Sequence, residues 1–267
     1  MPEGDTIYRS AAVLRRALVG ETIQATACHN PRCERPLPDD QLVGQTCVAI
    51  EARGKHLLMH LNGGAAIHSH MGMTGSWHLY RPGEPWQKPT NYASLALQFN
   101  EFLAVCFTPH TLELLSTDAL EHHSQLCQLG PDILDESFNP ETAVVRFGRH
   151  GSVPLGIAIM NQRIVCGIGN VYKSELLFLE RLDPFGAVES FTFEQLQRLL
   201  AQSRRLMLRN LDGRPRQTRF DGGGRLWVYG RNGQPCHRCA SPIRMRRQGD
   251  AGRSTYWCTR CQQTAAS

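Results

Sequence analysis

Four cysteines near the end of the chain have the spacing of a zinc site. They form two Cys-x2-Cys pairs with 18 residues between them: Cys236, Cys239, Cys258 and Cys261. Four thiolates complete a tetrahedron around Zn²⁺ and leave no position open for a substrate, so the pattern predicts one structural zinc ion. A segment this short cannot bury a core of its own, and we expect it to fold as a metal-dependent β-hairpin.

The region around these cysteines is strongly basic. Residues 198–260 contain 15 arginines, no lysine and three acidic residues, whereas the whole chain carries a formal charge of only +5. The rest of the chain is therefore net acidic. This asymmetry favours an anionic partner, most simply nucleic acid; the alternative is an arginine-rich solvated surface.

A glycine-bearing turn joins two apolar helical segments within "NQRIVCGIGNVYKSE" at 161–175. Gly167 and Gly169 allow a tight backbone turn, and the helix that follows from Asn170 can offer N–H groups to an anion. The turn lacks the third glycine of G-x-G-x-x-G and no strand precedes it, which argues against a dinucleotide site. Taken alone, it could also be a simple helix connector.

The chain begins "MPEGDT", with Pro2 and Glu3 directly after the initiator methionine. By itself this reads as an ordinary polar N-terminus. Together with the later motifs it gains a chemical meaning, because an α-amino group at neutral pH is a better nucleophile than a lysine amine. With pKa values near 8 and 10.4, about 10% of the former and under about 0.1% of the latter is unprotonated at pH 7.

In their order along the chain, the motifs resemble those of the bacterial formamidopyrimidine-DNA glycosylase and endonuclease VIII family. The resemblance spans nearly the whole length and rests on Pro2-Glu3-Gly4, Arg53-Gly54-Lys55, "HSHMGMTGSW" at 68–77, "NQ…GIGNVYKSE" at 161–175, and the cysteine hairpin with Arg253 five residues before Cys258. It implies an enzyme of base excision repair that removes oxidised bases and then cuts the strand as a lyase.

The resemblance assigns the catalytic roles. Pro2, exposed by removal of Met1, would attack C1′ of the damaged nucleotide and form a Schiff base on its secondary amine. Glu3 would act as the adjacent acid/base, and Lys55 would complete the catalytic set at the phosphate next to the lesion. The resulting iminium accepts the electrons that allow β- and then δ-elimination of the two phosphates.

The resemblance also implies how damaged double-stranded DNA is held. Polar groups from separate elements would pinch the backbone while the nucleotide rotates out of the duplex. Met73 would fill the gap left in the base stack, unless it is a plain core or loop residue. The residues expected to contact DNA are Lys55, Met73, Asn170, Tyr172, Lys173 and Arg253.

Two departures from the formamidopyrimidine branch favour the endonuclease VIII branch and oxidised pyrimidines. That branch carries an Asp-Pro-Arg-Arg-Phe-Gly segment where this chain reads "TPHTLELL" at 108–115, and its long loop over oxidised guanine is not evident in the short "DGRPRQTRFDGGG" at 212–224. The alternatives are an oxidised-purine glycosylase and a non-catalytic protein that binds damaged DNA.

These residues require particular elements to position them. Asp5 to Val19 predicts a helix capped by Asp5, and short alternating runs from about 21 to 115 predict an antiparallel sandwich with Lys55 at a hairpin tip. Helical spacing dominates after Pro154. We expect an α+β fold with a catalytic domain (1–130), a linker (131–150), a DNA-binding domain (151–232) that the resemblance makes a helix–two-turns–helix, and the zinc hairpin (233–267).

The composition bounds the class of protein. The chain of 267 residues contains no run of 18 apolar residues and no basic segment followed by an apolar one at its start, so we expect neither a membrane span nor a secretory signal. We therefore expect a cytosolic monomer with reduced thiols, associated with the bacterial nucleoid if the resemblance holds.

Overall fold

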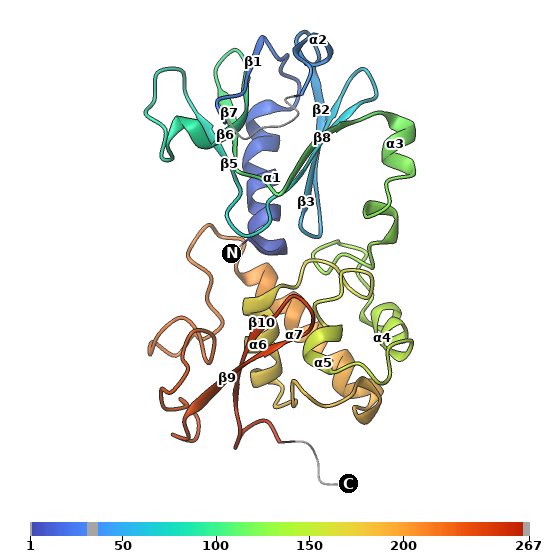
Figure 1. Ribbon diagram of the computed structural model, residues 1–267, viewed down its shortest axis with the longest axis vertical. Helices are drawn as coiled ribbons and strands as arrows, with labels where there is room; N and C mark the ends of the chain where they lie inside the picture. The colour runs from blue at the N-terminus through green and yellow to red at the C-terminus, as the bar shows by residue number, and fades with distance from the viewer. Residues whose placement is uncertain (1, 31–36, 264–267) are drawn as a thin grey trace. The chain divides into compact units, whose positions relative to one another are not determined.

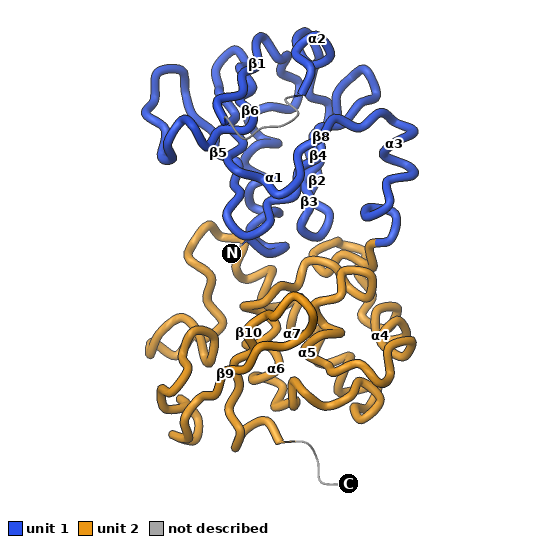
Figure 2. Tube along the Cα trace, viewed as in Figure 1, with its two compact units in different colours: residues 1–128 blue, residues 129–267 orange. Residues whose placement is uncertain are grey.

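The structure is a computed structural model in which residues 2–30 and 37–263 are described. Figure 1 shows the elements in chain order, and Figure 2 shows the two compact units into which the chain divides, residues 1–128 and 129–267. Within the described ranges, no helix is long and apolar enough to cross a membrane.

The first unit is a helix with two four-stranded antiparallel sheets, which confirms the predicted sandwich. Helix α1 (Gly4–Leu18) precedes every strand. One sheet has the order β1 (Ala25–Ala27), β6 (Ala93–Gln98), β7 (Leu103–Phe107), β5 (Ser76–Tyr80). The other has the order β2 (Cys47–Arg53), β3 (His56–Leu61), β4 (Ala66–His70), β8 (Thr111–Leu115). Short helical turns complete the unit: α2 (Asp39–Leu42), η1 (Thr90–Tyr92), α3 (Thr117–Glu121) and η2 (Leu126–Gln128).

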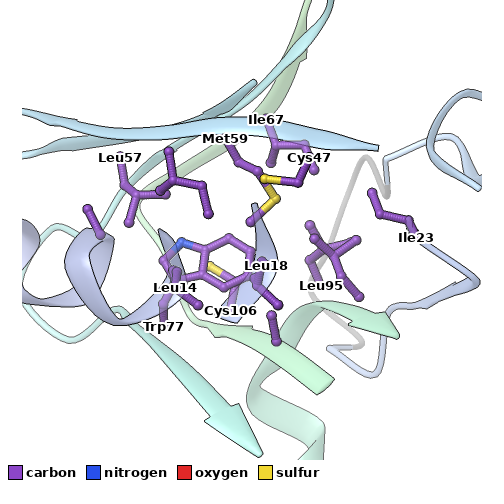
Figure 3. Packing of buried hydrophobic residues seen from close by; sticks show 14 of the residues in the cluster. Leu14, Leu18, Ile23, Cys47, Leu57, Met59, Ile67, Trp77, Leu95 and Cys106 are labelled. Atoms are coloured by element: carbon purple, nitrogen blue, oxygen red, sulfur yellow. The ribbon is translucent and has the colours of Figure 1, made fainter. Parts of the chain in front are cut away.

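Both sheets bury their inner faces against α1. Ile7, Ala11, Leu14 and Leu18 recur at helical spacing and are all buried. Figure 3 shows Leu14 and Leu18 surrounded by side chains from both sheets. This shared core fixes the N-terminal end of the chain relative to the strands, because α1 begins only two residues after Pro2.

The predicted helix exists, but the predicted cap is wrong. The residue at the N-cap position is Glu3, with extended backbone angles of φ −131° and ψ −179°. Asp5 lies inside the first turn, where its carboxylate accepts the N–H of its neighbour Thr6 at 2.7 Å. The capping rule placed the boundary two residues late because it favours Asp over Glu at this position.

The second unit is helical and ends in a β-hairpin. Its helices are α4 (Pro140–Gly148), α5 (Leu155–Ala158), α6 (Asn170–Leu179), η3 (Val188–Ser190) and α7 (Phe193–Arg209). The hairpin pairs β9 (Ile243–Gln248) with β10 (Arg253–Cys258). Part of the segment expected to be a linker is α4, whose buried Ala143, Val144 and Phe147 give it a reason to fold on the unit.

Helix α6 is the centre of this unit. Nine of its ten residues are buried, including Asn170, Lys173, Ser174 and Glu175. Its polar groups must therefore find partners within the protein. Helix α7 packs beside α6 and starts with a reciprocal capping box between Thr192 and Gln195. The hairpin packs on the same helix through a small core of Phe178, Val228, Ile243 and two cysteines.

Candidate functional site

The N-terminal end of α1 presents two of the predicted catalytic residues. The Glu3 side chain is fully buried, and its carbonyl oxygen accepts the N–H groups of Thr6 at 2.9 Å and Ile7 at 3.1 Å. Pro2 comes directly before it and is half-buried. Met1, whose removal the prediction requires, lies outside the described residues. The helix thus fixes the backbone of Glu3, which directly follows the residue that would carry the amine.

Lys55 lies at the tip of a hairpin, as predicted. β2 ends at Arg53, Gly54 turns with φ +61°, and β3 starts at His56. A left-handed φ is accessible to glycine without steric cost, which explains the break in the strand pattern. Lys55 is half-buried in this turn.

Met73 occurs at the same end of the sheet. β3 and β4 run antiparallel, and His56 at the start of β3 lies opposite His70 at the end of β4. The turn before β3 and the turn after β4 therefore lie at the same end of the sheet. Met73 is 60% exposed, whereas Met71 is 4% exposed and belongs to the core. Gly75 keeps this turn tight, since a Cβ there would lie 2.4 Å from the carbonyl oxygen of Met71. An exposed apolar side chain on a constrained turn has the form that a wedge needs.

In the second unit, the glycine-bearing turn delivers Asn170 to the first position of α6. Gly167 has φ +104°, and Gln162 braces the turn by accepting the N–H of Gly167 at 3.0 Å and donating to the carbonyl of Ile168 at 3.0 Å. Asn170 donates through Nδ2 to Ser254 Oγ at 3.1 Å. Its Oδ1 is buried and has no hydrogen-bond partner among the described residues.

Lys173 does not present its ammonium group on the surface. The residue is 1% exposed, and Nζ donates to Thr255 Oγ1 at 2.8 Å and to the carbonyl of Ser254 at 3.2 Å. The resemblance implied a phosphate contact for Lys173; in the structure the lysine ties the zinc hairpin to α6. Tyr172 is also fully buried, with the Arg216 guanidinium 4.9 Å from its ring centre. Both residues are therefore buried in α6.

Arg253 opens strand β10 and is half-buried. It lines a cavity of about 340 Å³ together with Asn161, Lys173, Gln248 and Asp250. Ser254, the next residue, is the partner of Asn170. The hairpin therefore brings Arg253 and the start of α6 into one polar region.

The four predicted zinc ligands converge. The sulfur atoms of Cys236 and Cys261 are 3.9 Å apart, those of Cys239 and Cys258 are 3.4 Å apart, and all four lie within 4.8 Å of one another. Zn–S bonds of about 2.3 Å in a tetrahedron place sulfur atoms about 3.8 Å apart. The described residues therefore fit one zinc ion with no open coordination position.

Glu175 is an organising residue that the sequence analysis missed. Its buried carboxylate accepts the N–H groups of Trp227, Val228 and Tyr229 at 2.7–2.8 Å and the hydroxyl of Thr218. Burial raises the pKa of Glu175, and these four hydrogen bonds oppose that shift. They hold the segment 218–229 onto α6 just before the zinc hairpin. No local pattern marks this role, because all four partners lie 43 to 54 residues further along the chain.

Comparison with known proteins agrees with this arrangement. Three family profiles cover most of the chain: the formamidopyrimidine-DNA glycosylase N-terminal domain at 1–110, its H2TH domain at 129–220, and the zinc finger found in FPG and IleRS at 233–264. A probable endonuclease 8 2 of Streptomyces coelicolor is 37% identical, covering 98% of this chain and 94% of its own length. The DNA-(apurinic or apyrimidinic site) lyase Nei2 of Mycolicibacterium smegmatis is 34% identical, covering 98% and 99%.

Solved structures show the same fold. The MutM (FPG) protein of Thermus thermophilus superposes with a TM-score of 0.80 at 27% identity and covers 98% of both chains. The Lactococcus lactis glycosylase bound to DNA with an abasic site gives 0.81 at 24% identity, covering 98% of this chain and all of the other. With a catalytic-domain match, an H2TH match, a zinc-finger match and whole-length relatives, the chain belongs to the family of formamidopyrimidine-DNA glycosylases and endonucleases 8.

Proposed function

We propose that this protein is a bifunctional DNA glycosylase and abasic-site lyase of base excision repair, acting on oxidised pyrimidines. The observation that carries the proposal is the buried carboxylate of Glu3 at the N-cap of α1, directly after Pro2. Relatives named as endonuclease 8 and as an abasic-site lyase support the same activity. A bacterial protein of this kind would work on the DNA of the nucleoid.

The chemistry follows from the two residues. The unprotonated amine of Pro2 forms a bond to C1′, and the bond from C1′ to the damaged base breaks. Opening of the sugar ring gives a cationic iminium between Pro2 and C1′. Loss of the proton at C2′ then expels the 3′ phosphate, and a second elimination expels the 5′ phosphate. Glu3 moves protons at the sugar ring oxygen and the departing base. Water finally hydrolyses the iminium and frees Pro2.

Lys55, Asn170 and Arg253 are the proposed phosphate contacts. Asn170 has one end of its amide without a partner, and rotating that amide by 180° lets Oδ1 accept from the Ser254 hydroxyl while Nδ2 is left to donate. Lys55 and Arg253 supply positive charge. Met73, 60% exposed, is the proposed wedge. Within the second unit, Lys173 ties the hairpin that carries Arg253 to α6 through Ser254 and Thr255, and Tyr172 is buried in the same helix. The one structural zinc supplies no reaction step and stabilises the hairpin that carries Arg253.

The preference for pyrimidines rests on the short connection between β7 and β8. Only Thr108, Pro109 and His110 separate these strands, so the chain has no room there for the wedge segment of the formamidopyrimidine branch. The proposal assigns wedging to Met73 alone.

A matched pair of duplexes tests the substrate. We expect a duplex with thymine glycol to be cut at least about tenfold faster than one with 8-oxoguanine, because pocket shape alone discriminates by about 10- to 200-fold. The measurement is single-turnover cleavage of end-labelled strands, with an undamaged duplex as control. Faster cutting at 8-oxoguanine would instead make the protein an oxidised-purine glycosylase.

A further inference from the structure

Three histidines and one glutamate form a hydrogen-bonded row, the histidine chain, that runs from β3 across β4 to β8 and on to His123, outside the proposed catalytic residues. His56 Nδ1 lies 2.8 Å from His68 Nε2, and His68 Nδ1 lies 2.7 Å from Glu113 Oε1. His123 Nε2 lies 3.1 Å from the same Glu113 oxygen. His68 is fully buried and His56 is 5% exposed. These groups come together because Glu113 on β8 stands directly opposite His68 on β4.

The contacts at both ends fix where the protons are. The backbone N–H of Leu126 donates to His123 Nδ1 at 3.2 Å, so a neutral His123 carries its proton on Nε2 and donates it to Glu113. The carboxylate can only accept, so His68 donates from Nδ1. His68 Nε2 must then accept from His56 Nδ1. One arrangement of protons therefore satisfies every bond in the chain with all three histidines neutral.

This arrangement disfavours a metal at the same place. His68, Glu113 and His123 offer three ligand atoms within 4.8 Å of one another. A metal on His123 Nε2 would require the proton of that ring to move to Nδ1, where it would face the N–H of Leu126. Two donors would then point at each other. The hydrogen-bonded chain satisfies the same atoms without that conflict.

The His56 end of the histidine chain lies beside the two turns that carry proposed DNA contacts. His56 directly follows Lys55, and its ring lies 4.8 Å from the ring of His70, centre to centre. His70 Nδ1 accepts the N–H of Gly72 at 3.3 Å, and Gly72 directly precedes Met73. The ring of His110 lies on another side of His70, with 5.8 Å between the two ring centres.

We propose that Glu113, His68 and His56 are positioning residues: their hydrogen bonds of fixed polarity, continued by the ring contact between His56 and His70, hold the turn of Lys55 and the turn of Met73 in register. The effect on DNA rests on the proposed function, whereas the proton positions do not. Burial first, then His70, His68, His123 and Arg53, lower the pKa of His56 to about 3, which favours the neutral ring of that residue. Burial, then His110, Lys55 and His68, lower the pKa of His70 to about 4.

The first test determines which nitrogen of each histidine ring carries the proton. In long-range ¹H–¹⁵N spectra of the histidine-labelled full-length protein at pH 7.5, we expect His56 and His68 to be protonated on Nδ1, and His70 and His123 on Nε2. His68 protonated on Nε2, or protonated on both nitrogens, would overturn the proposal. So would a second zinc ion per chain that Glu113→Ala abolishes, since the cluster would then be a metal site.

The second test separates positioning from charge. Glu113→Ala removes the hydrogen bonds that Glu113 accepts from His68 and His123. It should weaken binding to a duplex with a stable abasic-site analogue by about tenfold, because a hydrogen bond to a charged group contributes at least the free energy of a tenfold change in an equilibrium constant. Glu113→Gln keeps an acceptor oxygen and should stay within about twofold of wild type. Glu51→Ala is the matched control, because Glu51 pairs with His60, 3.5 Å away, in the same sheet but outside the chain.

Equal binding by wild type and Glu113→Ala contradicts the positioning role, and so does a failure of Glu113→Gln to rescue. If Glu113→Ala does not fold, the spectra of wild type alone decide. A wild-type protein that shows the expected proton positions but neither binds nor cleaves abasic DNA would refute the proposed function and leave the hydrogen-bonded chain intact.

Discussion

Glu3→Gln is expected to slow base excision by about 100- to 10,000-fold, the usual contribution of a general acid/base. Glutamine has the shape of glutamate but cannot exchange a proton with the sugar or the base. The fold should be unchanged, because the helix start depends on the backbone carbonyl of Glu3, which accepts from Thr6 and Ile7. The measurement is single-turnover release of an oxidised pyrimidine from duplex DNA.

Glu101→Gln is a suitable control, since Glu101 is exposed in the turn between β6 and β7. It removes a carboxylate of the same type from the same unit and should leave the rate unchanged. If Glu3→Gln releases the base as fast as wild type, the carboxylate takes no part in proton transfer.

Removal of zinc is expected to abolish specific DNA binding while α1 and the sandwich stay folded. The free energy of zinc binding is largely folding free energy for such a module, about 10–16 kcal/mol in peptides. Without the metal, the hairpin loses its small core of Ile243 and two cysteines, and Lys173 and Asn170 lose Thr255 and Ser254 as partners. Chelation or Cys258→Ser should produce the same loss, followed as binding of an abasic-site duplex.

The matched control is Cys28→Ser, because Cys28 is an exposed free thiol in the first unit. It should bind zinc at one ion per chain and bind DNA as wild type does. If protein from which a chelator has removed all zinc binds DNA with full affinity, DNA binding does not depend on the metal.

Sequence patterns that extend over only a few residues predicted much of the site. The Cys-x2-Cys pairs predicted the ligands that converge, and Gly54 predicted the turn at Lys55. The apolar spacing of α1 predicted its buried face. In each case the cause lies within a few residues or in one ligand geometry. Two local predictions failed: Glu3 took the cap position of α1 that Asp5 was expected to hold, and part of the expected linker is helix α4.

The contacts that the sequence did not reveal involve partners far along the chain. Lys173 was expected to contact DNA; α6 is buried on nearly every side, and the lysine donates to residues 81 and 82 positions later. The contacts of His68 likewise depend on the register of β4 against β8. No spacing rule encodes such pairings, because they arise only once the strands and the hairpin are packed.

Borohydride trapping with peptide mapping tests the central claim most directly. Wild-type protein incubated with abasic-site DNA and sodium borohydride should form a stable adduct, because reduction converts the iminium to an amine that cannot hydrolyse. Mass spectrometry of the digested adduct should find the DNA on Pro2 in chains that lack Met1, and Pro2→Gly should trap far less. An adduct on Lys55, an adduct formed equally by Pro2→Gly, or no adduct in chains that lack Met1 would contradict the assignment of Pro2 as the nucleophile.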